Sequence, residues 1–193
     1  NTVVLKPSQS TPLTACLMME AFRLADFPKG VVNLVSGRGS RAGAELALNP
    51  KVAMISFTGS TAVGVSLSQQ ALKTVKRISL ELGGKSPCVW LPDLPDYRPA
   101  VKPLFNSIFL NSGQTCTALS RLIVPKARLA EVEKLLQDHV KDYPVGDPFD
   151  PKVLIGPMAS RQQFETVKSY IELGVKEGAR LLAGSIPEEP GAH

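Results

Sequence analysis

The chain has 193 residues, of which 44% are hydrophobic and 20% charged, and its 22 Lys and Arg against 17 Asp and Glu give a formal net charge of +5. This composition is typical of a folded globular protein and excludes a disordered chain. The apolar runs are too short for a transmembrane helix, no secretory signal is visible at the start, and the basic residues are scattered, which disfavours a nucleic-acid-binding protein.

Strands and helices alternate in the first half of the chain. Apolar runs predict strands at residues 2–5, 31–35, 52–57 and 77–82. Apolar periodicity and helix-start residues predict helices at 12–26, 42–48 and 60–72. Strands and helices in this order imply right-handed crossovers and a parallel sheet with helices on both faces. Ligands of such sheets bind beyond the carboxyl ends of the strands.

The glycine pair Gly83-Gly84 interrupts this pattern and is the predicted domain boundary. Beyond it we expect strands at 86–91 and 121–124 and helices at 98–110, 129–143 and 160–177. This second unit is expected to be truncated, because two strands are too few to close a core. The first residue is Asn1 and the end is a polar, turn-rich stretch, so the chain is expected to be a fragment of a longer protein.

Two strand-to-helix turns of the first half suit a dinucleotide. Residues 36–43 (SGRGSRAG) are close to a G-x-G-x-x-G pattern, although the third glycine comes one position late. Residues 57–61 (FTGST) place hydroxyl groups beside the free N–H groups of a helix start, which favours a pyrophosphate. Each turn alone is equally compatible with a turn or helix cap that binds nothing. Together they make a dinucleotide site more probable than either does alone.

The three cysteines cannot all pair and no C-x-x-C occurs, which predicts a reducing compartment, the cytoplasm, and neither a disulfide framework nor a metal site. Cys16 and Cys88 lie in apolar segments and are predicted to be small core residues. Cys116 lies in a polar loop between a helix and a strand, where a thiol is accessible and its pKa can be lowered by nearby amides. By itself, however, this position favours a loop cysteine without a role.

A cysteine nucleophile usually has a histidine partner, and this chain offers only two. His139 lies near the apolar side of a predicted helix and is expected to be a packed structural residue, and His193 is terminal. The predicted base is therefore a carboxylate, Glu81, which lies between two leucines just before the glycine pair. Apolar surroundings would disfavour its charged form and suit a general base. A salt bridge at the strand end is the alternative.

Four segments resemble the NAD(P)-dependent aldehyde dehydrogenases. Residues 81–87 (ELGGKSP) resemble the glutamate signature of that family and residues 113–116 (GQTC) its cysteine signature, while residues 57–61 and 6–8 (KPS) are similar to two cofactor segments. They occur in the family's order and at its spacings. The resemblance implies a Rossmann-like parallel sheet in residues 1–83, part of a dinucleotide-binding domain, and part of a second α/β catalytic domain in residues 84–193. It covers essentially the whole chain, which supplies well under half of a family member.

The resemblance implies that Cys116 attacks an aldehyde to form a thiohemiacetal, that hydride passes to NAD or NADP, and that Glu81 activates the water that hydrolyses the resulting thioester. The Cys116 N–H would be one oxyanion donor and an asparagine upstream of this chain the other. The isolated chain is therefore expected to be inactive. Retention of Glu81 argues against the acyl-CoA-forming branch of the family.

Cofactor contacts are implied at four residues after the third and fourth predicted strands: Gly59 and Ser60 for the pyrophosphate, Val63 near the adenine, and the carbonyl of Leu82 for the nicotinamide carboxamide.

Four more cofactor positions follow the first two predicted strands. Gly39 and Gly43 fall where the family makes close adenosine contacts and packs a helix tightly. Lys6 and Gln9 fall at the ribose, and Gln9 replaces a glutamate that is usual in the family. Because an amide carries no charge to repel a 2′-phosphate, we expect NADP to be usable.

Two other function classes stay open: a non-catalytic nucleotide-binding relic of the family, and a different cysteine enzyme such as a hydrolase. A binding module needs neither Cys116 nor Glu81, and a hydrolase leaves the dinucleotide site unexplained. The expected partners are a small aldehyde and, in the full-length form, further copies of the protein, with no nucleic acid and no membrane.

Overall fold

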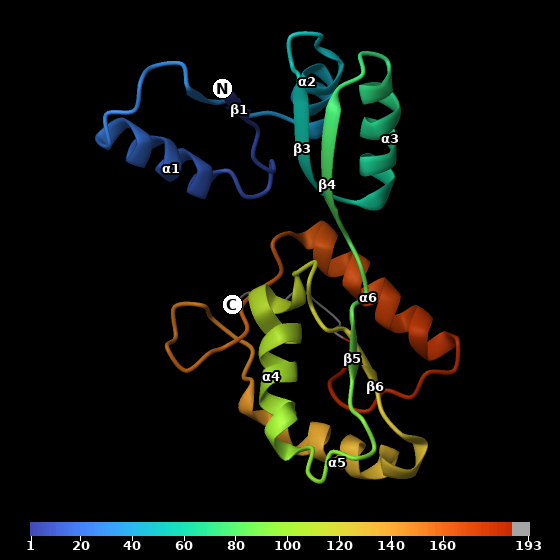
Figure 1. Cartoon of the computed structure of the whole chain (residues 1–193). Helices are drawn as coiled ribbons and strands as arrows, with labels where there is room; N and C mark the ends of the chain where they lie inside the picture. Colours follow the sequence, from blue (N-terminus) through green and yellow to red (C-terminus); the bar gives the residue numbers. More distant parts are fainter. Residues whose placement is uncertain (187–193) are drawn as a thin grey trace. The chain divides into compact units, whose positions relative to one another are not determined.

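The computed structural model describes residues 1–186, and residues 187–193, which include His193, lie outside this part. The chain divides into two compact units, Asn1–Gly83 and Gly84–His193, joined at the glycine pair (Figure 1).

The first unit alternates strands and helices as the sequence predicts. Its elements are β1 (Val3–Leu5), α1 (Leu13–Leu24), β2 (Val32–Leu34), a π-helical turn (Gly39–Gly43), α2 (Ala44–Leu48), β3 (Met54–Gly59), α3 (Thr61–Leu72) and β4 (Arg77–Leu82). β1 pairs with β2 and β3 with β4, and both pairs are parallel. In Figure 1, α3 runs alongside the β3–β4 pair and α1 lies apart from it. The predicted α/β class with parallel strands is confirmed.

The strands of the first unit form two separate pairs within the described residues, whereas the sequence predicted one sheet. β1 and β2 share three register pairs, and Val3 in β1 keeps 51% of its surface exposed. The third strand also begins two residues later than predicted. Val52 belongs to a turn in which its N–H donates to the Asn49 carbonyl at 3.1 Å. The Lys76 ammonium donates to the carbonyls of both residues, which holds the turn outside the strand.

The second unit contains β5 (Pro87–Val89), α4 (Arg98–Phe109), a 3₁₀ turn (Leu110–Gly113), β6 (Arg121–Ile123), α5 (Leu129–His139) and α6 (Arg161–Lys176). β5 and β6 pair in parallel. A core forms although the strands are few, contrary to our expectation, because α4 and α5 contribute most of its residues. Its buried members are Trp90, Tyr97, Val101, Leu104, Phe105 and Val132.

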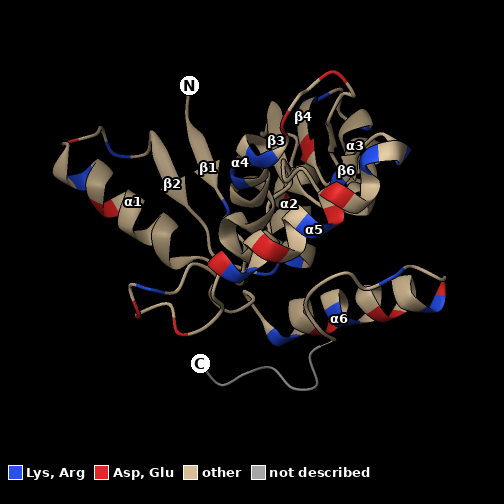
Figure 2. Cartoon of the chain, turned by 90° about the horizontal axis from the view of Figure 1, so that it is seen from below, with Lys and Arg blue, Asp and Glu red and all other residues tan. Residues whose placement is uncertain are grey.

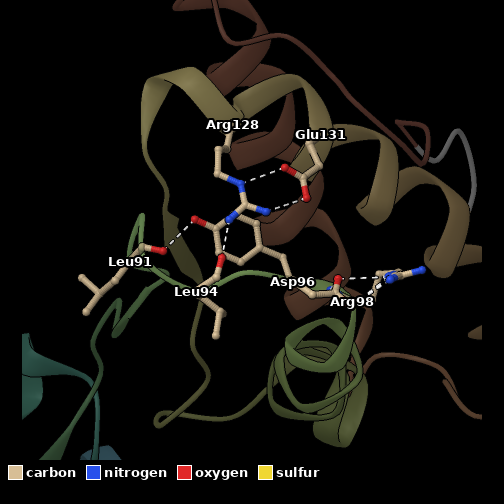
Figure 3. Close-up of polar contacts among 7 residues, drawn as sticks. Leu91, Leu94, Asp96, Arg98, Arg128 and Glu131 are labelled. Carbon is tan, nitrogen blue, oxygen red and sulfur yellow. Dashed lines mark hydrogen bonds and ion pairs between the residues drawn. The ribbon is translucent and has the colours of Figure 1, made fainter.

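Tyr97 is fully buried in this core, and its polar contacts join the loop after β5 to the start of α5 (Figure 3). Its hydroxyl donates to the Leu91 carbonyl at 2.8 Å, and the Arg128 guanidinium lies 3.7 Å from the centre of its ring. Arg128 also donates to the Leu94 carbonyl and pairs with Glu131 at 2.8 Å. A buried tyrosine thus has its hydroxyl paired and its ring covered by a cation, an arrangement that stabilises both parts.

Two carboxyl groups in this region have lowered pKa values. Arg128 donates to Glu131 and lowers its pKa, and Arg98 does the same for Asp96. Both pairs therefore stabilise the fold above the ordinary pKa of a carboxyl group and lose that contribution as the pH falls through the lowered values. Since the groups are exposed, the contribution is small.

Positive and negative side chains are interspersed on the helices. Figure 2 shows Lys and Arg next to Asp and Glu along α5 and α6, where the ion pairs Lys134–Asp138 and Arg161–Glu165 join successive turns. Among residues 1–186, no helix is both long enough and apolar enough to cross a membrane.

The first unit depends on a glycine where α3 crosses β4. A β-carbon at Gly64 would lie 2.7 Å from Cδ2 of Leu82, so a larger residue at this position would require the Leu82 side chain to shift. The control is Gly174 in α6, where an added β-carbon would meet no atom of another described segment within 4 Å.

We expect Gly64→Ala to lower the free energy of unfolding by about 1 kcal/mol, because overpacking outweighs the gain in helix propensity. Gly174→Ala has only the propensity gain and is expected to raise it by up to about 1 kcal/mol. Urea denaturation of both variants measures the difference. Equal stabilisation by the two substitutions would contradict the tight contact.

Candidate active site

The parallel register of β3 and β4 brings four predicted site residues to one edge. Gly59 pairs with Leu82 and Thr58 with Glu81, so both strands end together. Ser60 follows β3 directly. The carboxyl ends of parallel strands are where this class of sheet binds ligands, and this edge therefore carries Gly59, Ser60, Glu81 and Leu82 side by side.

Ser60 is the N-cap of α3. Its backbone is extended (φ −72°, ψ 149°), and its Oγ accepts from the Val63 N–H at 3.4 Å. The remaining N–H groups of the first helical turn have no partner within a helix, so this end attracts an anion such as a pyrophosphate. Val63, predicted to lie near the adenine, is 47% exposed and thus accessible to a ligand.

A β-carbon at Gly59 would overlap the ring of Phe57, so any other residue there would require this ring to move. The backbone before the α3 N-terminus is consequently bare, and a phosphate group can approach it closely. A bare strand end followed by a serine-capped helix fits the pyrophosphate of a dinucleotide.

Lys6 and Gly43 come together at the ends of β1 and β2. The Val35 N–H donates to the Leu5 carbonyl at 2.9 Å, which extends the parallel pairing to this edge. A β-carbon at Gly43 would lie 3.6 Å from Cε of Lys6. The Lys6 ammonium donates to the Pro7 carbonyl at 2.6 Å. Lys6 thus crosses the π-helical turn, which begins three residues before the helix predicted at 42.

Gly39 and Gln9 are accessible but are not tied to these residues. Within 4 Å of a β-carbon at Gly39 there is no atom of the described residues, so nothing in this unit explains why glycine stands there. Gln9 lies exposed in a turn closed by the Thr11 N–H and the Ser8 carbonyl at 3.3 Å.

Within its own unit Glu81 is exposed, and its leucine neighbours do not surround it. The reason is geometric. Successive side chains of a strand point to opposite faces, and Leu80 and Leu82 are half-buried on the face that Glu81 avoids.

Cys116 lies exposed in the loop between the 3₁₀ turn and β6. No residue of the described part accepts a hydrogen bond from its backbone N–H. An accessible thiol beside an available N–H is the arrangement that a nucleophile and its oxyanion donor require. The second donor and the base are not supplied by this loop.

The turn before Cys116 has an unusual backbone. Asn111, Ser112 and Gly113 all have positive φ angles, of 51°, 58° and 78°. Left-handed conformations at residues other than glycine cost of order 1–3 kcal/mol each and are often found at functional sites. We did not expect this turn from the sequence, although neighbouring Asn, Ser and Gly are residue types that tolerate such turns.

The other cysteines and His139 have ordinary surroundings. Cys88 was predicted to be a core residue, and it is half-buried and packs against the core of the second unit. Cys16 is exposed, contrary to prediction, because α1 has no buried residue in the described part of the chain. Nδ1 of His139 lies 2.8 Å from the Leu135 carbonyl at the half-buried end of α5, in keeping with a structural role. Residues 1–186 contain no cluster of His, Cys, Asp and Glu that could hold a metal ion.

Comparison with known proteins identifies the family. The sequence profile described as "Aldehyde dehydrogenase family" matches residues 1–193. The chain is 46% identical over 190 residues to a 3-succinoylsemialdehyde-pyridine dehydrogenase of Pseudomonas sp., covering 98% of this chain and 40% of that protein. It is 43% identical over 193 residues to human retinaldehyde dehydrogenase 3, covering 99% of this chain and 38% of the relative.

Solved structures agree. The crystal structure of a mutant aldehyde dehydrogenase C from Pseudomonas syringae in complex with NAD⁺ and octanal superposes with a TM-score of 0.94 at 44% identity, over 98% of this chain and 39% of that one. The NAD⁺ complex of an aldehyde dehydrogenase from Bacillus cereus gives 0.90 at 39% identity, over 95% and 37%.

Fold and sequence therefore define one class of protein, the α/β proteins whose parallel strands alternate with helices. The chain belongs to the aldehyde dehydrogenase family. It spans about two fifths of the length of the relatives that it matches.

The three cysteines differ in exposure, so we expect their thiols to be modified at different rates. Under native conditions iodoacetamide should modify Cys16 and Cys116 before Cys88, because the thiol of Cys88 is half-buried in β5. Peptide mass spectrometry after timed quenching measures the three rates. Modification of Cys88 first would contradict the packing of the second unit.

Proposed function

We propose that the protein containing this chain oxidises an aldehyde to a carboxylic acid with NAD or NADP as hydride acceptor. The observation that carries the proposal is the match of the family profile over all 193 residues, with complexes of NAD⁺ among the similar structures. The β3–β4 edge supports it, because Gly59 and Ser60 fit a pyrophosphate. Residues 1–83 would then belong to the dinucleotide-binding domain and residues 84–193 to the catalytic domain.

In this proposal Cys116 is the nucleophile. Its thiolate attacks the aldehyde carbonyl, and its own N–H stabilises the oxyanion of the thiohemiacetal. The bound nicotinamide supplies a hydride acceptor. Loss of hydride leaves a thioester on Cys116, and Glu81 takes a proton from the water that hydrolyses it. The products are the carboxylic acid and the free thiol, ready for another turnover.

The proposed cofactor-binding residues lie at the ends of two strand pairs of the first unit, β3–β4 and β1–β2. Gly59 and Ser60 would bind the pyrophosphate, Val63 would contact the adenine, and the Leu82 carbonyl would accept from the carboxamide. On the β1–β2 edge, Lys6 and Gln9 would contact the ribose, and the π-helical turn with Gly39 and Gly43 would lie along the adenosine. The support is positional: each group follows the carboxyl end of a parallel strand.

We further propose that residues 1–193 by themselves do not turn over aldehydes, because one oxyanion donor is an asparagine that the family resemblance places upstream. Loss of one such donor typically costs a hundredfold or more in kcat. The full-length protein is proposed to be a cytoplasmic homo-oligomer.

The function is tested in the full-length enzyme by Cys116→Ala. Removal of the nucleophile should lower kcat by at least about a thousandfold, measured as aldehyde-dependent formation of reduced cofactor. Cys16→Ala removes another exposed thiol and should leave kcat within about twofold. An active Cys116→Ala enzyme would exclude the mechanism.

Glu81→Gln separates the two half-reactions: a rapid burst of reduced cofactor should be followed by slow turnover.

Cofactor choice gives a separate prediction. Glutamine at position 9 accepts one hydrogen bond without repelling a 2′-phosphate, so Gln9→Glu should move the ratio of kcat/KM for NAD to that for NADP toward NAD by about tenfold, or roughly 1.4 kcal/mol. Gln69→Glu adds the same charge on the exposed side of α3 and is the control. An unchanged ratio in Gln9→Glu would show that Gln9 does not contact the ribose.

A further inference from the structure

The turn before Cys116 is held by a distant segment of the same unit. Its three consecutive left-handed residues, Asn111, Ser112 and Gly113, form a conformation that persists only where surrounding contacts determine it. Two side chains of the region supply such contacts to residues 156–159, about 45 positions further along the chain. The Ser112 hydroxyl donates to the Gly156 carbonyl at 2.9 Å, and the second contact is made by Gln114.

The side-chain amide of Gln114 makes two hydrogen bonds, one through its oxygen and one through its nitrogen. Its Oε1 accepts from the Ala159 N–H at 2.9 Å, and its Nε2 donates to the Asn111 carbonyl at 2.9 Å. Because the Ala159 N–H can only donate and the Asn111 carbonyl can only accept, the orientation of the amide is determined by its partners. Only a side chain with a donor and an acceptor at this spacing can make both contacts.

The segment that receives these bonds is itself anchored. Ile155 forms a bridge with Val145, and its carbonyl accepts from the Gly146 N–H at 3.1 Å. On the other side of the segment, Ser160 caps α6 by accepting from the Gln163 N–H at 3.2 Å. Residues 156–159 therefore lie between two fixed points and offer the turn a stable support.

Gln114 lies two residues before the thiol, and the residue between them is fixed as well. The Thr115 hydroxyl donates to the Leu110 carbonyl at 3.0 Å, and the Ala118 N–H donates to the Thr115 carbonyl at 3.2 Å. The peptide that carries the Cys116 N–H thus follows a backbone that is constrained on both sides.

From this geometry we propose that Gln114 is a positioning residue: its amide ties the Asn111 carbonyl of the left-handed turn to the Ala159 N–H, and this two-ended tie aims the thiol and the N–H of Cys116 at the aldehyde. The inference rests on the proposed role of Cys116 as nucleophile. Small displacements of reacting groups lower rates strongly, so loss of this tie should slow the formation of the thioester and leave cofactor binding intact.

The test uses Gln114→Glu in the full-length enzyme. A carboxylate keeps the bond from the Ala159 N–H but has no proton to donate to the Asn111 carbonyl. In a single-turnover experiment with enzyme in saturating excess over the aldehyde, the rate constant for formation of reduced cofactor should fall by about tenfold or more. The Kd of the cofactor should stay within about twofold of the wild-type value. This rate constant reports each active site, whereas a merely structural role would lower only the amplitude.

Gln137→Glu is the matched control. In the wild type the Gln137 Nε2 donates to the Leu182 carbonyl at 3.0 Å. This contact joins residues of the same unit that are also 45 positions apart in the sequence, and neither residue belongs to the Cys116 loop. We expect its single-turnover rate constant to stay within about twofold of the wild type. An equal fall in Gln137→Glu, or an unchanged rate constant with a lower amplitude in Gln114→Glu, would overturn the positioning role.

Ser112→Gly provides a second variant that tolerates the left-handed turn and removes the bond to Gly156. It should slow the single turnover severalfold without loss of thermal stability, and an unchanged rate would count against the proposal. The nucleophile is tested separately. If Cys116→Ala is inactive while Gln114→Glu is fully active, only the positioning role fails; if Cys116→Ala is active, the proposed function itself fails.

Discussion

The parallel pairing of β3 with β4 is the constraint on which the proposed cofactor site depends. With Gly59 opposite Leu82, the capped start of α3 and the Glu81 carboxylate are at the same end of the sheet. A slip of one residue would turn Glu81 toward the half-buried face and move Leu82 out of it. Gly64 lets α3 lie close to the side chain of Leu82 at this end of β4.

The second unit contains an irregular loop, the one that carries Cys116, next to a packed core. Its core is largely aromatic, with Tyr97 between the loop after β5 and the start of α5, and Phe105 packed in α4 beside Tyr143. The Arg128 guanidinium closes this cluster from outside. α4 is thereby a rigid element, and the left-handed turn that leads to Cys116 starts where α4 ends. A strained loop on a rigid helix is suited to a group that must keep its direction.

Apolar surface remains exposed in the first unit. Leu13 and Leu17 of α1 are 76% and 72% exposed, and the helix has no buried residue within the described part. Exposed patches of this kind mark interaction surfaces. The chain spans about two fifths of the length of the relatives that it matches. Cys16 lies on this same exposed helix.

The sequence by itself determined the α/β class, the alternation and parallel direction of the strands, and the family, because these depend on local periodicity, turn residues and motif order. It also placed Ser60 at the start of a helix, Glu81 near the end of a strand and Cys116 in a loop, as the structure has them. Only the tertiary structure decided which side chains are buried and what holds them. Glu81 is exposed because strand geometry turns it away from its leucine neighbours. The support of the Cys116 loop by Gln114 joins residues 45 positions apart, and such contacts depend on how segments pack, a property that no local pattern contains.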